Sequence, residues 1–123
     1  MPKTRAETRH IPLGDARQVS FCEYGHPRGK PVFYFHGTPG SRYEPALGDA
    51  AGRECGYRIR ALDRPGIGRS DYAKGRQLLD WPQDVQEVAA HLEIERFGVI
   101  GVSGGGPYAL ACGYALADRR EFA

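Results

Sequence analysis

The sequence has no run of about 18 apolar residues, so it offers no candidate for a membrane-spanning helix. The first residues, Met1 to Leu13, are polar and charged and lack the apolar stretch of a secretory signal, which leads us to expect a cytoplasmic protein. Cysteine is scarce and odd in number, at positions 22, 55 and 112, and no C-x-x-C pair occurs. This spacing indicates neither a disulfide framework nor a zinc site, so we expect buried thiols and no metal.

A strong charge of one sign is also lacking, because 17 lysines and arginines stand against 15 acidic residues, for a net charge of +2. That balance gives no reason to expect nucleic acid or an anionic membrane as a partner. The chain contains no internal repeat and no low-complexity segment. At 123 residues it has the length of one domain, and we predict a single domain over residues 1–123.

The apolar patterns predict an α/β fold with a mostly parallel sheet. Thr8–Leu13 and Gln18–Tyr24 alternate like half-buried strands around a turn at Gly14-Asp15, so we expect an antiparallel hairpin at one edge of the sheet. Further strands are expected over residues 32–35, 57–62 and 97–102. The first of these is apolar on both faces, as a strand of a parallel sheet covered on both sides should be.

Helical patterns alternate with these strands, over residues 41–56, 80–96 and 104–118. Ser41 with Glu44 fits a capping box, which predicts the start of the first helix. The side chain of Asp80 is expected to cap the first turn of the second helix. This alternation predicts crossover-connected parallel strands, with functional loops at their carboxyl ends.

The segment Phe97 to Pro107 is an apolar strand that runs into a glycine-rich turn with one serine at its apex. Residues 101–105, Gly-Val-Ser-Gly-Gly, fit the G-x-S-x-G nucleophile elbow, in which a serine sits on a strained turn between a strand and a helix. Gly101 and Gly105 flank Ser103 and lack the Cβ atoms that would collide where the strand and the helix come together.

Three loops, taken together, resemble those of the N-terminal half of an α/β-hydrolase. Residues 36–40, His-Gly-Thr-Pro-Gly, resemble the oxyanion loop of that fold, and residues 63–70, Asp-Arg-Pro-Gly-Ile-Gly-Arg-Ser, resemble its Asp-x-x-Gly-x-Gly-x-Ser turn. Residues 101–105 resemble its nucleophile elbow. The resemblance covers about residues 8–117 and implies a three-layer αβα fold that lacks its C-terminal half.

By this resemblance Ser103 would be the nucleophile, and the backbone N–H groups of Thr38 and Gly104 would form the oxyanion hole. His36 and Gly37 would shape the oxyanion loop. Related dehalogenases and epoxide hydrolases carry an aspartate nucleophile, so a serine implies acyl transfer on a small-molecule ester, thioester or amide. The resemblance implies no cofactor and no metal.

The base and the acid of a catalytic triad are missing from the sequence. In this fold the order is serine, acid and then histidine, but no histidine follows Ser103. Asp118 and Glu121 would lie about four helical turns from the serine. His36 is the histidine closest to the predicted site, and its expected role is structural. The other histidines, at positions 10, 26 and 91, are expected to be solvated or to cap turns.

Other interpretations of the same residues remain open. The glycines at 104–106 could cradle a phosphate at a helix N-terminus, although no P-loop Lys-Ser/Thr and no G-x-G-x-x-G pattern is present. Asp63 and Arg64 could be catalytic or could form a structural salt bridge. The whole chain could be a non-catalytic interaction or assembly module that retains the elbow without its base.

The strand Phe97 to Val102 is expected to form an exposed edge, because the later strands that flank it in the family are not in this chain. An apolar edge is a template for pairing with another chain. The helix that carries Leu110, Tyr114 and Leu116 is expected to be poorly covered on one side. We therefore predict a homo-oligomer, or a complex with a second chain, across this edge.

Overall fold

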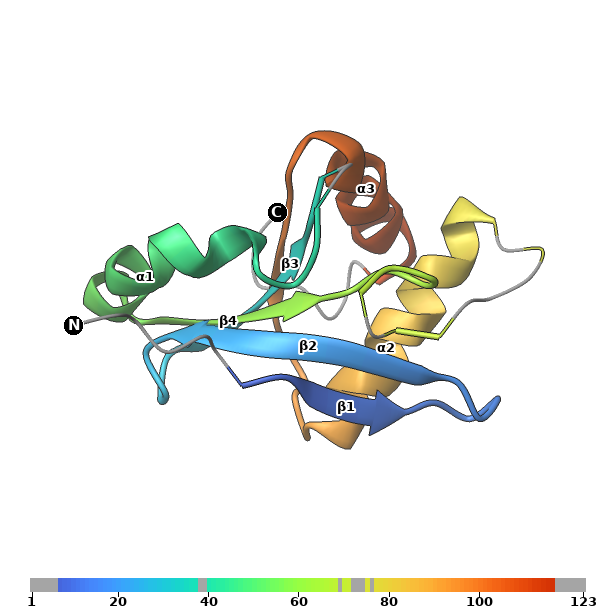
Figure 1. Cartoon of the computed structure of the whole chain (residues 1–123), viewed down its shortest axis with the longest axis horizontal. Coiled ribbons are helices and arrows are strands. Elements are labelled where there is room, and N and C mark those ends of the chain that lie inside the picture. The colour runs from blue at the N-terminus through green and yellow to red at the C-terminus, as the bar shows by residue number, and fades with distance from the viewer. Residues whose placement is uncertain (1–6, 38–39, 69, 72–74, 76, 117–123) are drawn as a thin grey trace.

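A mixed five-stranded sheet forms the centre of the protein in its computed structural model, which describes residues 7–37, 40–68, 70–71, 75 and 77–116 (Figure 1). Its strand order is β1-β2-β4-β3-β5. The strands are β1 (Arg9–Pro12), β2 (Gln18–Gly25), β3 (Lys30–Phe35), β4 (Tyr57–Leu62) and β5 (Gly98–Gly101).

The hairpin of β1 and β2 is antiparallel and lies at one edge, as predicted, with β2 antiparallel to β4. The strands β4, β3 and β5 are parallel, and Phe35 pairs in register with Leu62 on one side and with Gly101 on the other. The carboxyl ends of these three strands therefore lie side by side. Each loop that leaves them starts at the same edge of the sheet.

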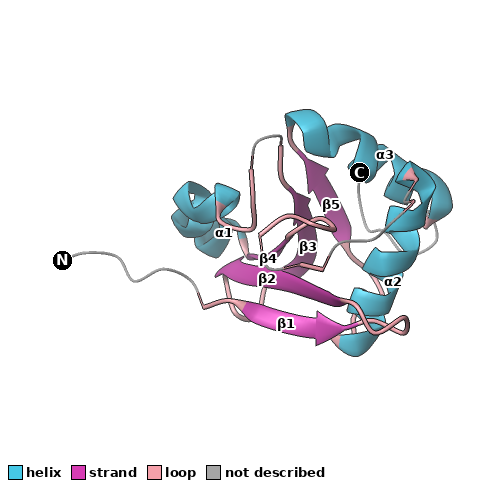
Figure 2. Ribbon diagram, turned by 45° about the vertical axis from the view of Figure 1, so that its right-hand side comes forward, coloured by secondary structure: helices cyan, strands magenta, loops and turns pink. Residues whose placement is uncertain are grey.

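Helices cover both faces of the sheet, so the predicted three-layer αβα arrangement is confirmed (Figure 2). Helix α1 (Asp49–Cys55) packs against β2 and β4 on one face, and α2 (Trp81–His91) and α3 (Gly106–Ala115) lie on the other. Short 3-10 turns precede the three helices, at η1 (Glu44–Gly48), η2 (Leu78–Asp80) and η3 (Ser103–Gly105).

The larger apolar core lies between the sheet and α2 and α3. Trp81, at the start of α2, is only 1% exposed and packs edge-on against Phe35 and Tyr108, with ring centroids 5.4 and 6.0 Å apart. Edge-to-face contacts of this kind add about 0.5–1.5 kcal/mol to the burial itself. Since Phe35 ends β3 and Tyr108 lies in α3, the contacts of Trp81 connect α2 to both β3 and α3.

Both predicted helix starts are wrong in detail. Ser41 and Glu44 form no capping box, because the Glu44 carboxylate turns away from the helix and accepts hydrogen bonds from Gly37 N and Tyr34 Oη. Asp80 does not cap α2 with its side chain, since it closes the 3-10 turn before the helix by accepting from Gln77 N at 2.8 Å. In both cases the carboxylate accepts a hydrogen bond from a backbone N–H outside the helix instead of taking part in the predicted cap.

Two burial predictions also need correction. Cys22 and Cys112 are buried, but Cys55 is exposed in the last turn of α1. Leu116 was expected to be poorly covered, yet it is only 9% exposed and belongs to the main core, whereas Leu110 and Tyr114 are 76% and 82% exposed. Helix α3 ends at Ala115, short of the predicted end at residue 118, and residues 117 and 118 lie outside the described residues.

Candidate active site

Three loops meet at the carboxyl ends of the parallel strands. His36 and Gly37 follow β3, Asp63 and Arg64 follow β4, and Ser103 follows β5 after a single residue. Val102 N donates to Phe35 O at 3.2 Å, so the ladder between β3 and β5 continues up to the serine. The sheet therefore brings the three sequence motifs together, as their order along the chain predicts.

Ser103 occupies a sharp turn and has an exposed side chain. Its φ angle of +49° is in the left-handed region, which costs a non-glycine residue about 1–2 kcal/mol. The strain is held in place by the strand before Ser103 and by the helical turn that starts at it. Strained residues of this kind are concentrated at functional sites.

Two glycines allow the turn to form. A Cβ atom at Gly105 would overlap the Phe35 carbonyl oxygen and lie 2.7 Å from His36 O. A Cβ atom at Gly101 would overlap Gly105 O and lie 2.8 Å from the Cβ of Ala109 in α3. Both positions are closer than any real Cβ contact, so the turn rests directly on the backbone of β3 only because these residues are glycines.

The loop after β3, which is the predicted oxyanion loop, lies next to the serine. A Cβ atom placed on Gly37 would be 3.4 Å from the Cβ of Ser103 and 3.1 Å from Val102 O, so Gly37 fills the space beside the turn. Gly104 is in the first turn after the serine, where backbone N–H groups lack partners within the helix. Thr38, the other predicted oxyanion donor, lies outside the described residues.

His36 is buried, with both ring nitrogens engaged. Its Nε2 accepts from Arg64 N at 3.2 Å, so Nδ1 carries the proton and donates to Gly37 O at 2.9 Å. Burial lowers the pKa of His36, and the opposing effects of the Gly37 carbonyl, Asp63 and Glu44 are smaller. The imidazole is therefore neutral and joins two loops, which fits a structural role better than that of a base.

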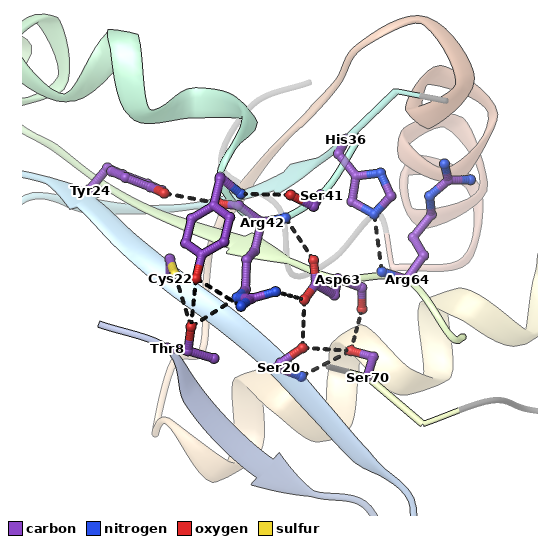
Figure 3. A network of polar contacts seen from close by, with 11 residues as sticks. Thr8, Ser20, Cys22, Tyr24, His36, Ser41, Arg42, Asp63, Arg64 and Ser70 are labelled. Atoms are coloured by element: carbon purple, nitrogen blue, oxygen red, sulfur yellow. Dashed lines mark hydrogen bonds and ion pairs between the residues drawn. The ribbon is translucent and has the colours of Figure 1, made fainter. Parts of the chain in front are cut away.

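Asp63 is fully buried at the centre of a polar network (Figure 3). Its carboxylate accepts from Arg42 N at 2.7 Å, from Arg42 Nη1 at 2.8 Å and from Ser20 Oγ at 2.6 Å. Ser70 Oγ donates to Asp63 O at 2.7 Å and accepts from Ser20 N at 2.9 Å. A buried carboxylate with this many donors is a structural clamp that holds the loop after β4 to β2.

Asp63 forms an ion pair with Arg42, with Nη1 and Oδ2 2.8 Å apart, and the described residues show no ion pair between Asp63 and Arg64, which their neighbouring positions had suggested. The guanidinium of Arg64 lies over the ring of Tyr108 in α3, 4.5 Å from the centroid. Arg42 could not be recognised as the partner from the sequence, because it is 21 residues from Asp63 and belongs to no recognised motif. An arginine beside the predicted capping serine was the only available signal.

The remaining described histidines lie away from Ser103. His10 is in β1, at the opposite edge of the sheet, and His26 follows β2 at the amino-terminal end of β4. His91 ends α2, before the chain enters β5 from that same end of the parallel strands.

Among residues 7–116, apart from the gaps given above, no group of three or more His, Cys, Asp or Glu side chains is placed to hold a metal ion. No described helix is long and apolar enough to cross a membrane.

Comparison with protein families gives one clear match. Residues 30–117 match the alpha/beta hydrolase fold family. A probable proline iminopeptidase of Streptomyces coelicolor is 37% identical over 106 residues, which cover 77% of this chain and 32% of the relative. A probable proline iminopeptidase of Leptolyngbya boryana is 30% identical over 112 residues, covering 89% of this chain and 35% of the relative.

A solved structure agrees with these relatives. The epoxide hydrolase CorEH superimposes with a TM-score of 0.83 at 28% identity, covering 94% of this chain and 40% of that protein. The chain thus spans about a third of the length of the curated relatives it matches.

The two glycines at 105 and 48 provide a matched test of the turn. We expect Gly105→Ala to lower the free energy of unfolding by about 1–3 kcal/mol or more, because the new methyl would overlap the backbone of β3. Gly48→Ala adds the same methyl at a position with a negative φ angle and no atom beyond its chain neighbours within 4 Å, and should change the free energy of unfolding by about 0.5 kcal/mol or less. Urea unfolding followed by circular dichroism measures both, and equal stabilities would contradict the close approach.

Burial of neutral His36 predicts a dependence of stability on pH. Its pKa is lowered in the folded state, so below the ordinary value of about 6.5 the unfolded chain binds the proton first and stability falls by up to about 1.4 kcal/mol per pH unit. Well above that value His36 is unprotonated in both the folded and the unfolded state, so it no longer contributes to the pH dependence of stability. Between pH 7.5 and 5.5, His36→Gln should lose less stability than the wild type, and His10→Gln, at an exposed position, should behave like the wild type. Parallel curves for wild type and His36→Gln would refute the prediction.

Proposed function

The chain belongs to the alpha/beta hydrolase fold family, and on that premise we propose that it carries the nucleophile of a serine hydrolase, Ser103. The observation that supports this most is the exposed, strained serine at the end of β5, pressed against the His36-Gly37 loop. A serine that only filled a turn would gain nothing from a left-handed φ angle, which glycine adopts without cost. The strained φ angle is explained if it directs the Ser103 hydroxyl out of the turn toward a substrate.

In the proposed reaction Ser103 Oγ attacks the carbonyl carbon of an acyl substrate and gives its proton to a base. The negative charge that forms on the carbonyl oxygen is stabilised by the N–H groups of Gly104 and Thr38. The helix dipole of η3 and α3 adds a positive field at Gly104. Loss of the leaving group yields an acyl-enzyme, which water hydrolyses.

The proposed substrate is a small molecule with an ester, thioester or amide bond. Among these, the names of the relatives favour an amide, since several are described as proline iminopeptidases. The serine at the nucleophile position favours acyl transfer even though an epoxide hydrolase shares the fold. His36 is held in loop contacts, so we propose that the triad base and acid come from polypeptide outside these 123 residues.

A fluorophosphonate probe tests the nucleophile directly. Attack of Ser103 Oγ on phosphorus displaces fluoride, and the oxyanion donors alone should support slow labelling even without a base. We expect a single adduct at Ser103 by mass spectrometry, faster in the presence of added imidazole. Ser103→Ala should abolish it, and Ser41→Ala, next to the oxyanion loop, should retain it. Absence of labelling in a folded chain would instead support the non-catalytic module.

A second candidate function, assembly, is favoured by the exposed face beside β5. Among the described residues β5 pairs only with β3, and Ile100 and Val102 are each 40% exposed. A groove of about 740 Å³ runs between β5 and α3, with Leu110 and Tyr114 on its wall. Its lining residues carry no charge. We propose that a second copy of the chain packs here, because an uncharged apolar face is complementary to itself across a two-fold axis.

Light scattering over a range of protein concentrations tests this assembly. We expect a dimer whose dissociation constant rises at least tenfold in Leu110→Lys, because the charge would have to be buried. Leu79→Lys, which changes an equally apolar residue that is 60% exposed on η2, should leave the dimer intact. A monomer at high concentration would contradict the proposal, and a mass matching a different polypeptide would identify another occupant of the same face.

A further inference from the structure

Glu44 is turned into the oxyanion loop although it begins a helical turn. Its Oε1 accepts from Gly37 N at 3.0 Å, and its Oε2 lies 3.2 Å from the same nitrogen. Tyr34 Oη donates to Oε1 at 2.7 Å. The carboxylate of Glu44 in η1 thus joins the end of strand β3 to the oxyanion loop.

Gly37 is held from its other side as well. Its carbonyl oxygen accepts from His36 Nδ1 at 2.9 Å, and an Arg64 guanidinium nitrogen lies 3.5 Å away. The residue that packs against Ser103 is therefore anchored at its N–H by Glu44 and at its C=O by His36.

The loop has the shape needed to admit this carboxylate. A Cβ atom at Gly40 would overlap Glu44 Oε2 and lie 2.5 Å from Gly37 O. The second glycine of the His-Gly-Thr-Pro-Gly segment is therefore needed for contact with Glu44. The Tyr34 hydroxyl keeps its proton and can donate it to Glu44, because burial, and to a smaller extent the neighbouring carboxylate, raises the pKa of Tyr34.

We propose that Glu44 is the positioning residue of the oxyanion loop: it sets the place of Gly37 beside Ser103 and, through it, the donor geometry of the proposed hydrolase site. The inference rests on the proposed function for its catalytic meaning, but the anchoring of Gly37 can be measured without any activity. Glu44 contacts neither substrate nor nucleophile in this role.

The charge of Glu44 is not what this role requires. A carboxylate near a site where negative charge develops opposes that charge, and its hydrogen bonds to Gly37 and Tyr34 only partly offset this. A neutral acceptor of the same shape keeps the hydrogen bonds of Oε1 with Gly37 N and Tyr34 Oη, in a weaker form. Glu44→Gln therefore separates the hydrogen bond from the charge, and Glu44→Ala removes both.

The test combines amide hydrogen exchange at Gly37, by NMR, with the rate of fluorophosphonate labelling at Ser103. In Glu44→Ala we expect exchange at Gly37 to accelerate by about tenfold or more, since a hydrogen bond to a charged acceptor is lost. Labelling of Ser103 should slow by about tenfold. Glu44→Gln should keep both rates within about threefold of wild type, and Glu54→Ala, an exposed glutamate of α1, should change neither.

Each outcome decides for or against the proposal. Unchanged exchange at Gly37 in folded Glu44→Ala overturns it, and so does faster exchange with unchanged labelling of Ser103. Rescue of both rates in Glu44→Gln supports it against a general loss of stability. If Glu44→Ala does not fold, Tyr34→Phe removes the hydroxyl that orients the carboxylate and should accelerate exchange at Gly37 by about threefold. If wild-type Ser103 is not labelled, the proposed function fails, and exchange alone decides whether Glu44 anchors Gly37.

Discussion

The contact of one backbone with another at Gly105 is the constraint on which the site depends. The turn after β5 lies directly on the carbonyl groups of Phe35 and His36, at a distance that excludes a methyl group. This contact places Ser103 in its left-handed conformation and brings it next to Gly37. The register of β3 with β5 and the packing of Trp81 between Phe35 and Tyr108 both support the same approach. A larger residue at position 105 would have to move the turn that carries Ser103 away from the loop after β3.

Two carboxylates hold the loops that surround this contact. Asp63 binds Arg42 and Ser20 and fixes the loop after β4, and Glu44 binds Gly37 and Tyr34 and fixes the loop after β3. Both depend on the short segment that contains Arg42 and Glu44, which follows the oxyanion loop in sequence. Asp63 is fully buried and Glu44 partly buried, and a carboxylate shielded from water without donors would be costly, so each depends on its hydrogen-bond donors. The rigidity of the site thus comes from side chains that take no direct part in the proposed reaction.

The strand β5 takes part in both proposed functions. Ser103 lies just beyond its carboxyl end, and Ile100 and Val102 expose apolar surface near α3. A partner on this edge would lie close to the proposed nucleophile, so assembly and the completion of the site are physically connected.

Local features of the sequence determined the fold class, the strand positions and the elbow, because alternation, turn glycines and motif order act over a few residues. The mostly parallel sheet and the edge hairpin were predicted in this way, β4 was predicted to the residue, and the αβα layers followed from the resemblance of three loop motifs to a known family. Only the tertiary structure decided which side chains meet across loops. Arg42 pairs with Asp63, and Glu44 abandons a helix cap for Gly37, since a buried N–H or carboxylate takes the partner that the folded backbone brings within reach. Such distances depend on the path of the whole chain, which no local pattern contains.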